Sequence, residues 1–157
     1  MKLSPVWQLK SFAQLTTDEL YDALKLRVDV FVVEQCCYYP ELDDLDRHKD
    51  TLHLFCYQQQ KLTAYLRILA KGQSYPDHLA IGRVVIAEKG RGNGMGHSLM
   101  EKSIDICQQY FPQQPIKISA QAHLEGFYNK HHFSRVSEVY LEDDIPHIAM
   151  VRATNEQ

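Results

Sequence analysis

Alternating glycines constrain the fold of this chain more than any other feature of its sequence. Gly90, Gly92, Gly94 and Gly96 follow an apolar run over residues 79–87, and a helical pattern comes after them. Glycine permits a sharp turn because it has no Cβ, and it lets the backbone approach a ligand closely. The N–H groups that open a helix have no partner inside it and can bind an anion together. The segment therefore predicts a strand, a turn and a helix, and it leaves open whether the turn is an anion cradle or only a turn.

The spacing of these glycines excludes two common phosphate-binding motifs. A P-loop continues from its last glycine with Lys and then Ser or Thr, whereas Gly96 is followed by His97 and Ser98. A dinucleotide fingerprint reads Gly-x-Gly-x-x-Gly, whereas a single residue separates each pair of glycines here. Arg91 adds a fixed positive charge of the kind that suits phosphate. A phosphate site of another type therefore stays open at this turn.

Capping and periodicity place the remaining elements. Thr16 and Glu19 form a capping box that starts a helix ending near Val33. A second helix follows the glycine turn and stops at Pro112, and a short third helix is expected near Leu124. The predicted strands cover residues 5–9, 52–57, 61–69, 79–87, 116–122, 135–141 and 145–152.

This order of strands and helices predicts the α/β class, with helices on the faces of a mixed sheet. A crossover through the second helix makes strands 79–87 and 116–122 parallel, with a right-handed connection. Residues 5–152 contain no linker-like segment, so we expect one domain. The acidic stretch 41–46 predicts an exposed loop, and a turn is expected at 143–144.

The composition argues against several classes of partner. The 17 Lys and Arg against 20 Asp and Glu give a net charge of −3, which argues against binding nucleic acid or an anionic membrane. The chain opens on no signal-peptide pattern and has no apolar run of about 18 residues, so we expect a cytoplasmic protein with no membrane partner. The 4 cysteines and 8 histidines lack the spacing of a metal site, and we expect reduced thiols and no metal.

The glycine turn and its flanks resemble the GNAT family of acyltransferases. Residues 91–96, RGNGMG, fit the family signature (Gln/Arg)-x-x-Gly-x-(Gly/Ala), with a strand before it and a helix after it. The resemblance covers about residues 5–152, and several separate motifs occur in the family's order. The segments that resemble the ElaA-like branch of the family are LRVDVFVVEQ (26–35), AYLRIL (64–69), IGRVVI (81–86), AQAHLEGFY (120–128) and DDIPHIAM (143–150).

The resemblance implies the GNAT acyl-CoA N-acyltransferase fold, in which a centrally splayed sheet admits the pantetheine arm of acetyl-CoA. It implies that turn amides hold the pyrophosphate, and that a main-chain N–H near Val85 or Ile86 polarises the thioester carbonyl. The positions that it implies for cofactor binding are Val84, Val85, Ile86, Arg91, Gly92, Asn93, Gly94, Met95, Gly96 and Tyr128.

The resemblance also implies proton-transfer residues. Tyr128 is the candidate acid for the leaving thiolate, because a tyrosine keeps its proton at neutral pH; read alone, it would be core packing beside Phe127. Deprotonating a lysine-like amine at neutral pH costs roughly 4.6 kcal/mol, so a base should help. Glu34, His123 and His147 are the candidates, and ordered water is an alternative to all of them.

We therefore expect an acetyl-CoA-dependent N-acetyltransferase that acts directly on a primary amine of a small molecule or peptide, as a monomer or a homodimer. The alternatives are a non-catalytic acyl-CoA sensor and transfer of a different acyl group. Acidic residues in loops 41–46 and 142–144 would favour a cationic amine if they line the acceptor cleft. One departure from the family is His132, which stands where a glycine commonly precedes Phe133 and is expected to adopt a left-handed backbone.

Overall fold

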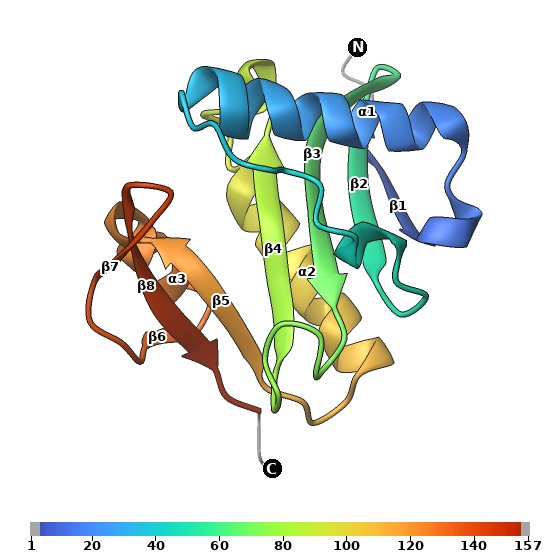
Figure 1. The fold of residues 1–157 in the computed structure, drawn as a ribbon. Helices are drawn as coiled ribbons and strands as arrows, with labels where there is room; N and C mark the ends of the chain where they lie inside the picture. Colours follow the sequence, from blue (N-terminus) through green and yellow to red (C-terminus); the bar gives the residue numbers. More distant parts are fainter. Residues whose placement is uncertain (1–3, 155–157) are drawn as a thin grey trace.

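One mixed sheet organises residues 4–154, the part of the chain that the computed structural model describes. Its strand order is β1-β2-β3-β4-β5-β8-β6, and β7 pairs with β8 (Figure 1). The strands are β1 (Val6–Ser11), β2 (Leu52–Gln58), β3 (Lys61–Leu69), β4 (Leu79–Ile86), β5 (Ile116–Gln121), β6 (Ser134–Arg135), β7 (Tyr140–Glu142) and β8 (Ile145–Arg152).

Helices cover both faces of this sheet. Helix α1 (Thr17–Arg27) lies across one face and α2 (Met95–Tyr110) lies behind the other. The predicted capping box is confirmed, because the Glu19 N–H donates to Thr16 Oγ1 at 3.1 Å and the Thr16 N–H donates to Glu19 Oε1 at 2.9 Å. The first helix continues to Glu34, near its predicted end, but its last part is a wider π-helical segment, η2 (Val28–Glu34). A short helix, α3 (Glu125–Asn129), follows β5.

The two faces have separate apolar cores. Leu54, Leu66 and Leu99 belong to the larger core, which packs between the sheet and α2. Phe55 and Tyr65 belong to the smaller core beneath α1. Because side chains alternate along a strand, Arg67 on β3 shares the α1 face with Tyr65 and is buried there. A charged side chain therefore lies inside the face that supports η2 and the loop after it.

Strands β4 and β5 run parallel, as predicted, but pair over only two residue pairs, Leu79 with Ile116 and Ala80 with Lys117. Beyond these pairs the strands diverge (Figure 1). The splayed centre of the sheet that the resemblance implied is therefore present. None of the helices within residues 4–154 is long and apolar enough to span a membrane.

The predicted strand 135–141 is wrong, because the structure has the short strands β6 and β7 with an irregular link between them. The Ser137 hydroxyl accepts the Ala149 N–H at 2.8 Å in place of a main-chain carbonyl, and this interrupts the ladder along β8. The predicted turn at 143–144 is confirmed, with both residues at positive φ, and His132 adopts the expected left-handed backbone at φ 67°.

Leu66→Ala tests the larger core. Leu66 is 0% exposed, so its loss should leave a cavity and lower the free energy of unfolding by about 2–5 kcal/mol. Urea unfolding followed by circular dichroism measures the change. Leu141→Ala is the matched control, because Leu141 is 68% exposed and its truncation should cost less than about 0.5 kcal/mol. Equal losses in the two variants would contradict this assignment of the core.

Candidate active site

A cavity of about 330 Å³ lies where β4 and β5 diverge. One side is formed by 81–84 of β4 and the other by 118–121 of β5, and further walls come from η2, the loop after it and the β7–β8 hairpin. Tyr128 of α3 also contacts this space. Because the strands do not pair here, their facing backbone edges are available to a ligand.

A bulge in β4 shapes the cavity. Tyr65 pairs with Val85 and Arg67 pairs with Gly82, so Arg83 and Val84 together oppose one residue of β3. Arg83 has φ 53°, a left-handed conformation that a β-strand residue other than glycine seldom adopts. A bulge bends a strand and redirects its side chains, and strained backbone of this kind gathers at functional sites.

Three arginines and three carboxylates form a set of ion pairs that we call the arginine network, and its members Asp43, Arg67 and Arg83 line one wall of the cavity. Arg27 Nε lies 2.6 Å from Glu41 Oε2, and Arg27 Nη1 lies 2.8 Å from Asp46 Oδ1. Further ion pairs join Arg67 to Asp43 at 2.5 Å and to Asp46 at 3.0 Å, and Arg83 to Glu41 at 2.8 Å. The network holds the loop after η2 against the sheet.

The expectation of an exposed acidic loop over 41–46 is wrong for Glu41 and Asp46, which are 4% and 6% exposed. Buried arginines require partners of opposite charge, and these carboxylates supply them. The acidic loop is therefore neutralised from within and does not offer a surplus of negative charge to a cationic acceptor.

The arginines favour the ionised forms of Asp43 and Asp46. Burial alone would raise the pKa of the Asp43 carboxyl, but the hydrogen bonds and charge of Arg67, with the charge of Arg83, lower this pKa to about 2. Burial also opposes ionisation of Asp46, but its pKa is lowered by hydrogen bonds and charge from Arg27 and Arg67.

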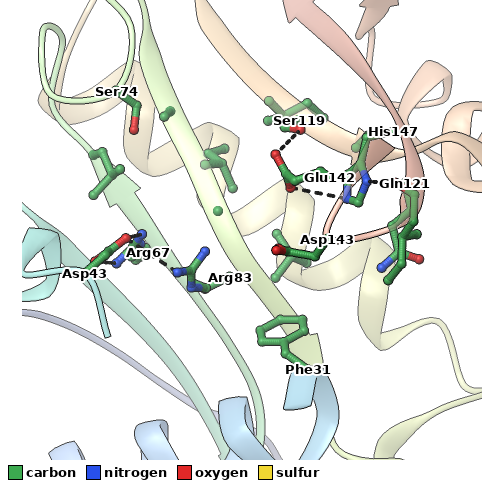
Figure 2. A pocket seen from close by; sticks show the side chains of 18 of the residues that line it. Phe31, Asp43, Arg67, Ser74, Arg83, Ser119, Gln121, Glu142, Asp143 and His147 are labelled. Carbon is green, nitrogen blue, oxygen red and sulfur yellow. Dashed lines mark hydrogen bonds and ion pairs between the residues drawn. The ribbon is translucent and has the colours of Figure 1, made fainter. Parts of the chain in front are cut away.

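The opposite wall holds His147 of β8 and Glu142 of β7 (Figure 2). His147 Nδ1 lies 2.7 Å from the Ile145 carbonyl oxygen, and Nε2 lies 3.4 Å from Glu142 Oε2. A carbonyl only accepts, so Nδ1 carries a proton and Nε2 faces a carboxylate. The Ser119 hydroxyl fixes the carboxylate by donating to Glu142 Oε1 at 3.1 Å.

Tyr128 lies near the C-terminal end of α3, between the cavity and the larger core. Its ring makes edge-to-face contacts with Phe127 and Phe133, with centroids 5.0 and 5.9 Å away. Burial raises the pKa of Tyr128 to about 12, so the phenol stays protonated at neutral pH. Among the described residues its hydroxyl has no hydrogen-bond partner, so the proton is free to face a ligand.

The glycine turn lies between β4 and α2. Gly92 and Gly94 have φ of 87° and 81°, and a Cβ at either position would meet nothing within 4 Å. The space above the turn is therefore open to an anion. Asn93 is exposed there, whereas Met95 is buried in the larger core. Gly96 has a different role, because a Cβ there would lie 3.4 Å from the Phe127 ring of α3.

The structure brings some of the predicted residues together and separates others. Tyr128 and His147 line one cavity, whereas Glu34 and His123 are exposed and do not line it. Glu34 Oε2 lies 3.0 Å from Arg91 Nη2, beside the glycine turn.

The residues implied for the pantetheine arm also face different ways. Val84 lines the cavity, Val85 packs beneath α1, and Ile86 packs against the larger core. The Ile86 carbonyl accepts a hydrogen bond from Arg91 Nε at 3.1 Å, which fixes the arginine beside the turn.

Comparison with known protein families shows to which family this chain belongs. The family model described as the Acetyltransferase (GNAT) domain matches residues 19–153. The chain belongs to the GNAT family. The resemblance inferred from the glycine turn and its neighbouring motifs is thereby confirmed, and the protein is an acyltransferase.

Similar proteins cover nearly all of this GNAT chain. ElaA of Escherichia coli K12 is 42% identical over 146 residues, which are 93% of this chain and 95% of that protein. The crystal structure of E. coli ElaA has a TM-score of 0.90 and covers 95% of this chain and 99% of its own. An acyl-CoA N-acyltransferase from Pseudomonas aeruginosa has a TM-score of 0.91 at 47% identity, covering 96% and 100%. The GNAT acyl-CoA N-acyltransferase fold is confirmed.

Sequence reasoning missed Arg67 and Arg83 of this GNAT site, and it named Glu142 only among the loop acids that could line the acceptor cleft, without its pairing with His147. Arg67 and Arg83 interrupt the apolar segments 64–69 and 81–86, which were used only as strand and family signals. An arginine inside a buried strand needs carboxylates nearby, and the acidic run 41–46 was the available source. Arginines in two apolar segments together with this acidic run therefore indicated buried ion pairs. The sequence could not show which carboxylate pairs with which arginine.

Acid should weaken the arginine network. The pKa of Asp43 is lower in the folded protein than in the unfolded chain, so its contribution to stability is complete above about pH 4 and is lost as the pH falls toward 2. Urea unfolding at several pH values should show this loss, and Asp43→Asn should flatten it. Asp105→Asn, an exposed position on α2, is the control and should keep the wild-type slope. Equal slopes in the two variants would contradict the assignment.

Proposed function

We propose that this protein is an acetyl-CoA-dependent N-acetyltransferase that transfers the acetyl group directly to a primary amine of a small molecule or peptide. The observation that carries the proposal is the shared cavity of Tyr128 and His147 at the parting of β4 and β5. The matching family model, an acetyltransferase domain, supports acetyl as the group transferred. Four free thiols fit a cytoplasmic protein, which we propose to be a monomer or a homodimer.

The glycine turn fits the pyrophosphate of coenzyme A. Gly92 and Gly94 leave open space above the turn, and α2 begins directly after it, so unpaired amides over 91–96 can face the phosphates. Arg91 is fixed beside them by its bonds to Ile86 and Glu34. We propose that the edge of β4 from Val84 to Ile86 binds the pantetheine arm. Bound acetyl-CoA supplies a thioester carbonyl that an amine can attack.

His147 and Glu142 are the base that the geometry supports best. Their shared arrangement can accept a proton from the amine as its nitrogen bonds to the carbonyl carbon and the carbon–sulfur bond breaks. Ordered water between the amine and His147 is the alternative route. Glu34 and His123 lie outside the cavity wall, and we propose for Glu34 the separate task of orienting Arg91.

Tyr128 supplies the proton that the departing thiolate takes up. Its phenol is protonated, it lines the cavity, and no described residue occupies its hydroxyl. A thiol has a pKa of about 8.5 and a buried thiolate is costly, so a donor beside the sulfur lowers the barrier. Tyr128 and the pair of His147 with Glu142 therefore divide the two proton transfers between them.

Tyr128→Phe tests the acid. The ring and its aromatic packing remain, so coenzyme A affinity by calorimetry should stay within about twofold, while kcat for thiol release should fall by about 10². Tyr110→Phe is the matched control, because Tyr110 is 55% exposed on α2 and should keep wild-type turnover. Unchanged turnover in Tyr128→Phe, with an amine that the wild type acetylates, would remove Tyr128 from the mechanism.

Gly94→Glu tests the cradle. The substitution strains a left-handed position and places a carboxylate in the open space above the turn, so coenzyme A binding should be lost. Gly72→Glu is the control, because Gly72 has φ 94°, equally open surroundings and a place in the β3–β4 loop away from the turn. Calorimetry with coenzyme A should separate the variants. Micromolar affinity in Gly94→Glu would exclude this pyrophosphate site.

A further inference from the structure

We infer that the acetyl acceptor is a small amine that carries a carboxylate, and that Arg83 binds this carboxylate. The inference rests on the proposed function, because it names the class of amine that the same site acetylates. It starts from the guanidinium group of Arg83, which lies on one wall of the cavity with a nitrogen that no described residue accepts from (Figure 2).

Arg67 supports this wall from β3. Its residue surface is 3% exposed, and it lines the cavity. Its hydrogen bonds to Asp43 and Asp46 all use Nη1 and Nη2. The Nε group has no partner among the described residues, but it has almost no accessible surface, so a molecule in the cavity does not reach it. Arg67 therefore serves the site by holding Asp43, which also lies 3.5 Å from Arg83 Nη2.

Arg83 contributes the donor. Its Nε donates to Glu41 Oε2 at 2.8 Å, and its Nη2 donates to the Glu41 carbonyl at 3.0 Å and to Asp43 Oδ2 at 3.5 Å. No hydrogen bond to another described residue uses Nη1. The bulge in β4 holds the residue at φ 53°, so the fold keeps a strained conformation that brings this guanidinium to the cavity wall.

The charge balance favours a single carboxylate over a dianionic group. Arg27, Arg67 and Arg83 are matched by the three carboxylates of the network, so the wall offers a spare donor but no surplus positive charge. A dianion such as phosphate would add two uncompensated charges to a site with little water, whereas a carboxylate adds one and presents planar oxygens that suit guanidinium donors.

The opposite wall fits the amine of the same molecule. Glu142, Asp143 and His147 line the cavity across from the arginines, as Figure 2 shows for the labelled side chains. An ammonium near Glu142 would balance the ligand's carboxylate, so the ligand enters as a zwitterion with no net charge. The cavity of about 330 Å³ suits a small amino acid better than a long peptide.

The test compares amines that differ only in the carboxylate. Glycine, β-alanine, γ-aminobutyrate and 5-aminopentanoate are each paired with the corresponding primary amide, and thiol release from acetyl-CoA gives kcat/KM, corrected for the fraction of neutral amine. For the best chain length, we expect the carboxylate to exceed its amide by at least about tenfold, as charge-assisted hydrogen bonds predict.

Arg83→Asn ties the preference to the site. Asn tolerates a left-handed backbone better than most residues, and Glu41 keeps its bonds to Arg27 and Tyr39. The ratio of carboxylate to amide should fall to within about threefold of one. Arg135→Asn, on the exposed strand β6, is the control and should keep the wild-type ratio. Calorimetry of the same compounds with the coenzyme A-loaded protein provides a readout that needs no turnover.

The outcomes separate this inference from the proposed function. Equal kcat/KM values for carboxylates and amides would overturn the inference and leave acetyl transfer standing. Binding of a carboxylate that is lost in Arg83→Asn, with no amine acetylated, would show that Arg83 binds a carboxylate, and it would overturn the proposed function together with the inference that this ligand is the acetyl acceptor. Absence of both binding and turnover for every carboxylate would overturn the inference as well.

Discussion

The parting of β4 from β5 is the constraint on which the rest of the structure depends. Two residue pairs join these strands, and beyond them each strand presents backbone groups without a strand neighbour. A sheet can tolerate such a gap only where each part has its own support, and here α2 packs behind β3 and β4 while β8 pairs with β5 along its whole length. The gap is then a ligand site held open by the packing on either side, because the unpaired edges need hydrogen-bond partners that the protein itself does not provide.

The cavity also depends on the arginine network, because the network holds the loop after η2 in place as one wall of the cavity. The loop after η2 has few apolar anchors, and Leu42 within it is 59% exposed. Its position comes instead from Glu41, Asp43 and Asp46, which meet arginines of α1, β3 and β4. Such a network is a weak source of stability, since burial of its charges costs about as much as their attraction returns. Its value lies in geometry, because planar guanidinium groups hold carboxylates in one register.

Local rules predicted much of the fold and only part of the site. The capping box at Thr16, the glycine turn and the turn at 143–144 each depend on residues close together in the sequence, and the structure has all three. The link over 136–139 was missed because a serine hydroxyl replaces a main-chain acceptor, which no periodicity records. The arginine network and the pairing of His147 with Glu142 depend on where distant strands and loops meet. Residue types could suggest them but could not choose the partners.

The net charge of this chain does not predict which charges a ligand meets inside the cavity. The excess of three acidic residues over the whole chain suggested a site that favours cations. Of the acidic residues that line the cavity, however, Asp43 is committed to Arg67, while Glu142 and Asp143 lie on the opposite wall. What a ligand meets is the remainder after the ion pairs are counted: a spare guanidinium N–H of Arg83 on one wall, and Glu142 and Asp143 with His147 on the other. Coenzyme A is likewise a polyanion that a −3 chain can bind, because main-chain amides at a helix start carry partial charges that a count of side chains omits. Recognition by this fold is therefore set by which donors the folded chain leaves unpaired.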